Sequence, residues 1–206
     1  MRSALKWAES KNLIDRAPKI YRPERPAPRD DRLTRDQIGI FLAHCTFPHV
    51  KLFVTLAVTT GARMSAILQL TWDRVDFDRG TIVYRDPEQG RTKKGRATVP
   101  INDMARAALL EAQRGALTPF VVEWAGSRVV SIKKGLASVG KRCGLPWVTA
   151  HVFRHSAATA MAERGVPMAE IAQFLGHADS RITERVYARF SPTYLRRAAD
   201  ALEFVA

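Results

Sequence analysis

The chain has 206 residues and a formal net charge of +13, because its 33 lysines and arginines outnumber its 20 aspartates and glutamates. This length accommodates one substantial core with a small appendage and does not require two large domains. The basic residues are spread along the chain and form no tail, which favours a folded basic surface and a polyanionic partner. On charge alone, a merely soluble basic domain is the alternative.

The cysteines and the apolar runs indicate a cytoplasmic chain. Cys45 and Cys143 lie in apolar helical patterns without a Cys or His partner at zinc spacing, so we expect reduced core residues and no metal. No apolar run approaches ~20 residues, and the charged stretch from Met1 to Leu13 lacks the apolar segment of a secretion signal. We therefore expect no membrane contact.

The first 32 residues predict a short helix and a linker. Residues 1–14 have helical spacing with one apolar side, and the predicted segment ends by residue 16. Four prolines follow within residues 17–32, where they exclude a helix and favour an extended, semi-stiff chain rich in arginine.

The compact part of the chain begins with three predicted helices. Thr34 and Gln37 fit a capping box, which marks the start of the first helix. Pro48 opens a second helix that is apolar nearly all round, and Gly61 ends it in the position that favours a left-handed residue. Residues 64–70 form the third, short helix.

Two strands are predicted next, over 81–84 and 97–101, joined by a basic turn at 89–96. A helix over 103–114 follows, and 120–124 is a candidate third strand. From residue 131 onward the pattern predicts only helices, with breaks at Gly165, Gly176 and Pro192 and a cap at Ser191: about 131–142, 150–164, 167–175, 180–190 and 192–204. The expected fold is mainly α with a small antiparallel β-sheet, an α+β class.

Chemistry-bearing residues gather in the last third of the chain. His151 and Arg154 are three apart on a predicted helix, so their side chains face the same way. Arginine can donate paired hydrogen bonds to phosphate oxygens, and a neutral imidazole can accept or relay a proton. His155, one turn from His151, is an alternative for the imidazole's role. Taken alone, such a His-Arg pair is more often a solvated or capping pair.

Two more candidates follow. His177 comes directly after Gly176, at the start of a loop from which its ring can reach a cleft. Tyr187 lies on the next predicted helix, where a tyrosine is ordinarily a packing residue. As a nucleophile its phenol, with a reference pKa of ~10, needs cationic neighbours or a base.

Cations earlier in the chain complete the set. Arg63 directly follows the helix end at Thr60-Gly61-Ala62, which places its side chain at a surface. Lys93 and Lys94 occupy the hairpin turn, where a mobile tip can carry a lysine to a phosphate and donate a proton to a leaving oxygen. Solubility is the commoner role of such a turn.

The order of these residues resembles the catalytic domain of the tyrosine recombinases, the phage integrase family. The match runs from about Leu33 to Phe190, and the segment from His151 to Tyr187 carries the specific motifs. The matching positions are Thr60-Gly61-Ala62-Arg63, Lys93, His151-x-x-Arg154, Leu175-Gly176-His177 and Tyr187.

The resemblance implies a site-specific DNA recombinase, an integrase that cleaves and rejoins DNA strands without metal or cofactor. Tyr187 would attack a phosphodiester, leaving a 3′-phosphotyrosyl bond and a free 5′-hydroxyl. Arg63 and Arg154 would hold the non-bridging oxygens and stabilise the transition state. His151 would assist proton transfer at Tyr187, and His177 would hydrogen-bond the phosphate.

The resemblance implies two roles for the hairpin turn, as general acid and in DNA binding. Lys93 would protonate the departing 5′ oxygen, with Lys94 as the alternative general acid, and Arg91, Lys94 and Arg96 would bind the DNA. The sequence departs from the family pattern at Ala66, where an acidic residue is usual. It also has one extra residue between His177 and Tyr187 compared with the commonest family spacing.

The resemblance also suggests an organisation and partners. Residues 33–190 would be the catalytic domain, 1–16 the remnant of the last helix of an N-terminal DNA-binding domain, and 17–32 its linker. The helix within 191–206 would pack in trans. We therefore expect an isolated catalytic domain that binds double-stranded DNA, monomeric alone and tetrameric on DNA. It would be encoded by a bacterium or phage and associated with the nucleoid.

Two alternatives remain from the sequence. Residues 160–172 also resemble a helix-turn-helix with Gly165 at the turn, which would suit a non-catalytic DNA-binding regulator. A regulator, however, has no need for four of these residues together: Arg63, His151, His177 and Tyr187. A topoisomerase-like nicking-closing enzyme would share the same chemistry.

Overall fold

The computed structural model describes residues 2–21, 31–84, 97–177, 179–200 and 202. The chain divides into two compact units, Met1–Asp30 and Asp31–Ala206. Among the described residues of the first unit, Arg2–Ser10 form helix α1, and residues 16–21 have no regular secondary structure. The division of the chain into a remnant helix, a linker and a catalytic domain stays a prediction.

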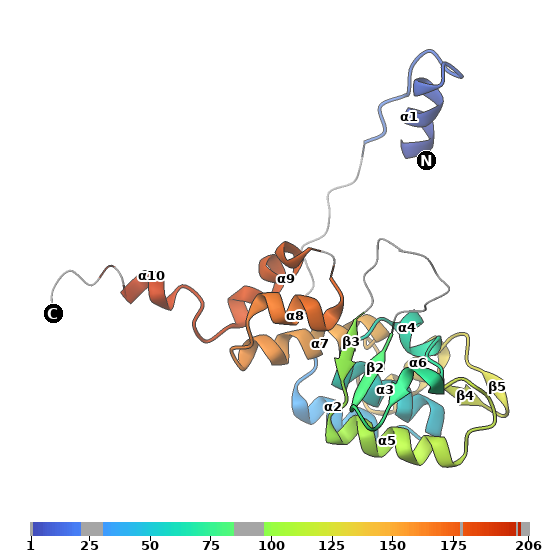
Figure 1. Cartoon of the computed structure of the whole chain (residues 1–206). Helices are drawn as coiled ribbons and strands as arrows, with labels where there is room; N and C mark the ends of the chain where they lie inside the picture. Colours follow the sequence, from blue (N-terminus) through green and yellow to red (C-terminus); the bar gives the residue numbers. More distant parts are fainter. Residues whose placement is uncertain (1, 22–30, 85–96, 178, 201, 203–206) are drawn as a thin grey trace. The chain divides into compact units, whose positions relative to one another are not determined.

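The second unit is mainly helical with two small antiparallel sheets (Figure 1), which confirms the predicted fold class. No helix among the described residues is long and apolar enough to cross a bilayer. In chain order the elements are α2 (Arg35–Ala43), α3 (Pro48–Thr60), α4 (Met64–Leu68), η1 (Trp72–Arg74), β1 (Val75–Asp76), β2 (Thr81–Val83), β3 (Thr98–Pro100), α5 (Asp103–Arg114), β4 (Glu123–Trp124), β5 (Ser127–Arg128), α6 (Lys133–Arg142), α7 (Ala150–Glu163), α8 (Met168–Leu175), α9 (Ser180–Tyr187), η2 (Ala188–Phe190) and α10 (Arg196–Asp200).

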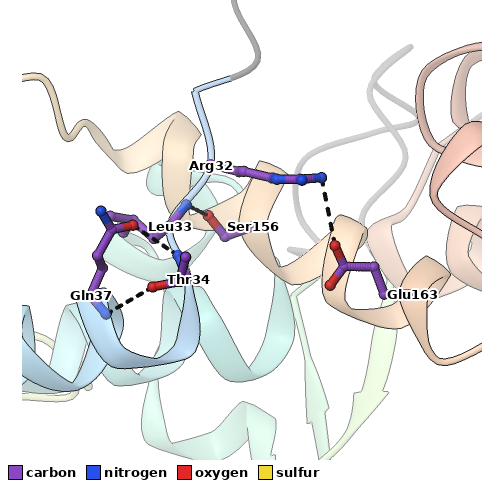
Figure 2. A network of polar contacts seen from close by, with 6 residues as sticks. All are labelled: Arg32, Leu33, Thr34, Gln37, Ser156 and Glu163. Atoms are coloured by element: carbon purple, nitrogen blue, oxygen red, sulfur yellow. Dashed lines mark hydrogen bonds and ion pairs between the residues drawn. The ribbon is translucent and has the colours of Figure 1, made fainter.

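The predicted capping box at the start of α2 is confirmed. The Gln37 N–H donates to Thr34 Oγ1 at 3.2 Å, and the Thr34 N–H donates to Gln37 Oε1 at 2.9 Å (Figure 2). The residues just before it are tied to α7, because the Leu33 N–H donates to Ser156 Oγ at 2.8 Å. The side chains of Arg32 and Glu163 add an ion pair of 3.5 Å, so the start of this unit is fixed against α7.

Helix α3 lies at the centre of the core, as its nearly continuous apolar surface predicts. It packs against α7 on one side and α5 on another. Phe53 of α3 is fully buried, and Phe41 of α2 meets Phe153 of α7 edge to face with ring centroids 5.2 Å apart. Burying each of these aromatic side chains contributes on the order of 2–3 kcal/mol, so α2, α3 and α7 form one rigid block.

The main sheet has the order β1-β2-β3, with Ile82 of β2 paired to Val75 and to Val99. Residues 120–124 were the candidate third strand of this sheet, and that prediction is wrong. Their last two residues form β4, which pairs with β5 in a separate hairpin. Strand β1, only two residues long, is too short to give a period-2 pattern in the sequence.

The C-terminal segment departs from the predicted helix over 192–204. Among the described residues, α10 covers only Arg196–Asp200. Leu195 has a left-handed backbone with φ of +57°, which an α-helix does not accommodate, so the helix starts after it. Ser191 ends η2, where its N–H donates to the Ala188 carbonyl, and it does not cap α10.

Gly61 is the residue whose backbone sets the exit from α3. Its φ is +59°, and a Cβ built there would lie 2.5 Å from Leu175 Cδ2 of α8. A side chain would therefore be strained twice, by the left-handed backbone and by the close approach of α8.

We expect Gly61→Ala to lower the free energy of unfolding by about 2–4 kcal/mol, the sum of left-handed strain and overpacking. Gly80→Ala is the matched control, because Gly80 has a φ of +63° with nothing within 4 Å of a built Cβ. It should lose only about 1–2 kcal/mol. Urea unfolding followed by circular dichroism measures both, and equal losses would contradict the proposed clash with α8.

Candidate active site

The Arg154 side chain joins three helices at one point. It projects from α7 with only 5% of its surface exposed. Its Nη1 donates to the Gly61 carbonyl at 2.6 Å, and its Nη2 donates to the Leu175 carbonyl at 2.9 Å. Both carbonyls lie at helix C-termini, where they lack partners within the helix and carry partial negative charge. The ends of α3 and α8 thus fix the orientation of this guanidinium.

Arg63 lies beside it as the N-cap residue of α4. Its Nη1 donates to the Gly176 carbonyl at 3.4 Å, so the two arginines bind neighbouring carbonyls at the end of α8. Burial, followed by the charge of Arg63, lowers the pKa of Arg154 to about 10. Both guanidiniums stay protonated at neutral pH, and their combined field favours an anion between them.

A hydrogen-bonded pair supports the loop that carries Arg63. The Thr60 hydroxyl donates to the Leu56 carbonyl at 2.6 Å and lies 3.0 Å from the Tyr84 hydroxyl. Because Thr60 uses its proton on Leu56, Tyr84 acts as the donor to Thr60. The Ala62 N–H also donates to the Thr60 hydroxyl at 3.3 Å. The end of β2 is therefore tied to the arginine loop.

His177 follows the left-handed Gly176 that ends α8, as the sequence predicts. Its Nδ1 lies 2.6 Å from the Thr183 hydroxyl, which is fully buried on α9. Burial, followed by the charges of Arg154 and Arg63, lowers the pKa of His177 to about 4. The ring is therefore neutral near pH 7 and offers one donor and one acceptor nitrogen.

Tyr187 is the last residue of α9 and is 6% exposed. Its hydroxyl lies 3.1 Å from Nδ1 of His155, and the two rings are tilted by 42° with centroids 5.2 Å apart. Burial raises the pKa of Tyr187, and the charge of Arg154 acts in the opposite direction. The phenol therefore lies within the field of Arg154 and is hydrogen-bonded to the second histidine of α7.

His151, by contrast, is exposed at a pocket of about 450 Å³ that Arg63, Arg154 and Lys133 also line. Partial burial of its ring, followed by the charge of Arg154, lowers the pKa of His151. Of the predicted catalytic residues, the structure brings together five: Arg63, His151, Arg154, His177 and Tyr187. The hairpin residues Arg91, Lys93, Lys94 and Arg96 lie outside the described residues.

Sequence reasoning missed two parts of the site and left the role of His155 open. Lys133 adds an ammonium group to the pocket wall. In the sequence it is one of two lysines at the start of α6, and this position is informative because the helix dipole disfavours cations there. Thr183 had no signal, because threonine is common on helices.

Ala66 is buried in α4, so the position where an acid is usual contributes packing. Among the residues described, no cluster of His, Cys, Asp and Glu is arranged to hold a metal ion.

The fold is that of tyrosine recombinase catalytic domains. The integrase of transposon Tn1549, solved in complex with transposon right-end DNA, superposes with a TM-score of 0.78 at 17% identity, covering 98% of this chain and 76% of that one. The tyrosine recombinase XerA of Thermococcus kodakarensis is 31% identical over 204 residues, covering 94% of this chain and 70% of that protein. The integrase of Salmonella phage P22 is 26% identical, covering all of this chain and 56% of that protein.

A family model for the phage integrase family matches residues 31–193. The chain therefore belongs to the phage integrase family, the tyrosine recombinases. The matched residues span α2 to η2, which include every described residue of the site.

The low pKa of His177 predicts a pH dependence of stability. Between pH 6.5 and pH 4 the unfolded chain binds a proton that the folded chain does not bind at His177. The free energy of unfolding should therefore fall as the pH falls through this window. In His177→Gln this fall should be shallower, measured by urea unfolding at several pH values. His44→Gln, at an exposed position of the same unit, is the control, and equal slopes in wild type and His177→Gln would refute the prediction.

Proposed function

We propose that this chain is a site-specific DNA recombinase that cleaves a DNA strand through Tyr187 and rejoins it through a 3′-phosphotyrosyl intermediate. The observation that supports this most strongly is that the Tyr187 phenol lies within the field of the Arg154 guanidinium, which itself interacts with Arg63. The family that the chain belongs to supports the same reaction, and DNA is the anion that its charge of +13 suits.

In this mechanism the scissile phosphate binds between Arg63 and Arg154. Charge grows on the non-bridging oxygens as the tyrosine oxygen approaches phosphorus, and both guanidiniums stabilise that charge. Arg154 is already oriented by the Gly61 and Leu175 carbonyls, so little reorganisation is needed when the transition state forms. His177, neutral at pH 7, donates a hydrogen bond from Nε2 to the phosphate when Thr183 donates to its Nδ1.

The reaction moves two protons. The bond between Tyr187 Oη and phosphorus forms while the bond from phosphorus to the 5′ oxygen breaks. The phenol proton passes to an imidazole, with His151 and His155 as the two candidates. Lys93, or Lys94 in its place, supplies a proton to the departing 5′ oxygen, and Arg91 and Arg96 bind the DNA beside it. Attack by a 5′-hydroxyl on the phosphotyrosine reverses these steps and rejoins a strand.

We also propose that the chain is monomeric alone and assembles as a tetramer on double-stranded DNA in the cytoplasm, at the nucleoid. Three apolar side chains of the C-terminal segment support assembly through this segment, because they are half exposed or more: Tyr194 at 50%, Leu195 at 64% and Leu202 at 65%. Such side chains gain free energy by packing in a hydrophobic groove of a neighbouring chain.

Tyr187→Phe should abolish covalent DNA adducts while leaving DNA binding within about twofold, because only the nucleophilic oxygen is removed. Nicked suicide duplexes trap the adduct, which is measured as a protease-sensitive band on a denaturing gel. Tyr194→Phe, an exposed tyrosine outside the pocket, is the control and should form the adduct like wild type. Adducts that persist in Tyr187→Phe would reject Tyr187 as the nucleophile. If neither the wild type nor Tyr194→Phe forms an adduct, a DNA-binding regulator is favoured.

The double change Leu195→Ser with Leu202→Ser should leave one chain bound per DNA site and prevent assembly, because it removes the apolar contacts of the C-terminal segment. Light scattering with and without DNA measures this. Leu117→Ser, at an apolar residue 76% exposed elsewhere on the surface, is the control and should assemble normally. Unchanged assembly in the double variant would count against packing in trans.

A further inference from the structure

The Arg32 guanidinium contacts α7 and η2 at the same time. Its Nη1 lies 3.5 Å from Oε1 of Glu163, the last residue of α7 (Figure 2). Its Cζ lies over the ring of Phe190, the last residue of η2, 4.6 Å from the ring centroid. One cation thus lies between a carboxylate and the face of an aromatic ring. It connects the chain that enters this unit with the end of α7 and with the segment after α9.

The backbone beside Arg32 is fixed to α7. The Leu33 N–H donates to Ser156 Oγ at 2.8 Å, and the Ser156 hydroxyl donates to the Val152 carbonyl at 2.8 Å. Leu33 and Ser156 are both buried, and hydrogen bonds are stronger where water is excluded. The guanidinium therefore reaches Phe190 from a backbone position that is held on α7.

The Phe190 ring is closely connected to the proposed nucleophile. Segment η2 begins at Ala188, directly after Tyr187, so no loop separates the two aromatic residues. Phe190 also packs against the buried apolar cluster that contains Tyr187, together with Ala158 and Ala162 of α7. The segment η2 packs on both α7 and α9. A displacement of Phe190 from α7 would therefore displace Tyr187 as well.

A second arginine contacts the same ring, but its contact has a different consequence. The Cζ atom of Arg189 lies 4.7 Å from the centroid of the Phe190 ring. Arg189 belongs to η2 and moves with the ring, whereas Arg32 comes from the chain that is held on α7. The ion pair between Arg32 and Glu163 is partly exposed and contributes little, because water screens it. The stacking of Arg32 on Phe190 is therefore the contact that restrains η2.

We propose that Arg32 is a positioning residue for Tyr187, because its stacking on Phe190 holds η2 against α7 and keeps the Tyr187 hydroxyl in the candidate active site. This rests on the proposed function. Arg32 takes no part in the proton transfers or in binding the scissile phosphate. Loss of the stacking lets Tyr187 leave its position while the arginine pair stays in place. It should therefore lower the rate of strand cleavage and leave the affinity for DNA unchanged.

The first experiment separates the rate of attack from DNA binding in the full chain. A pool of nicked duplexes with randomised sequence around the nick is captured by the wild-type chain, and a captured sequence serves all variants. Single-turnover adduct formation at saturating DNA gives the rate, and a titration gives the Kd. The variants are Arg32→Ala, Phe190→Leu, their double variant, Glu163→Gln for the ion pair, and Arg35→Ala as the control for the loss of an exposed charge.

We expect Arg32→Ala to lower the rate about two- to fivefold, which is the effect of losing one partly exposed cation–π contact. Its Kd should match that of Arg35→Ala, which loses the same charge. In the Phe190→Leu background, Arg32→Ala should have no further effect, because the ring through which it acts is gone. Glu163→Gln and Arg35→Ala should keep a rate within about 1.5-fold of wild type.

The second experiment follows Tyr187 without DNA. 3-Fluorotyrosine replaces the four tyrosines, and Tyr187→Phe identifies the fluorine resonance of residue 187. In Arg32→Ala this resonance should move or broaden toward its position in the urea-unfolded chain, whereas in Arg35→Ala it should not change. The Arg32 side chain is 39% exposed, so its truncation leaves the core intact, and circular dichroism checks that the variant is folded.

Three outcomes would overturn the inference while Tyr187 adducts still form. One is an Arg32→Ala rate equal to that of Arg35→Ala, and another is a further loss when Arg32→Ala is added to Phe190→Leu. The third is an unchanged fluorine resonance in Arg32→Ala. If Phe190→Leu does not fold, Phe190→Met repeats the double-variant comparison. If the wild-type chain captures no duplex, the proposed function fails, and the fluorine resonance still decides whether Arg32 positions Tyr187.

Discussion

The Arg154 guanidinium donates to the carbonyls of Gly61 and Leu175, and these two bonds connect the ends of α3 and α8 through α7. Removing a cation from water costs several kcal/mol, which the helix-terminal carbonyls offset only in part because they carry dipoles and no net charge. Burial lowers the pKa of Arg154 for this reason, and the charge of Arg63 lowers it further. The same two bonds that position the side chain thus leave its charge uncompensated, and under the proposed function this charge binds the scissile phosphate.

The rest of the fold stabilises that contact from several directions. The sheet holds the arginine loop through Tyr84 and Thr60, and the chain entering the unit is pinned to α7 through Leu33 and Ser156. Arg32 also lies over the ring of Phe190, 4.6 Å from its centroid, just after the helix that ends in Tyr187. Elements distant in sequence therefore restrain the arginine loop, α7 and the segment after α9, and none of these restraining residues is a proposed catalytic residue.

Local patterns predicted the parts of the structure that local forces determine. The capping box at Thr34 and the limits of α3 between Pro48 and Gly61 were predictable because their residues satisfy or break helical hydrogen bonds by themselves. The two-residue strand β1 and the late start of α10 depend on pairing and on the backbone at Leu195, which leave no periodic signal. In the site, the motif indicated which residues gather, but the rotation of α7 against α9 decides which histidine meets Tyr187. That rotation is a property of packing.

The contact between Arg154 and Gly61 spans 93 residues of sequence, and the one between Leu33 and Ser156 spans 123. Closing such long loops carries a large entropic cost, which only the assembled core repays. A chain still being synthesised cannot form the bond between Arg154 and Leu175 until α8 has left the ribosome, and Tyr187 emerges later still. Under the proposed function, a partly made copy therefore has no assembled site with which to cleave DNA.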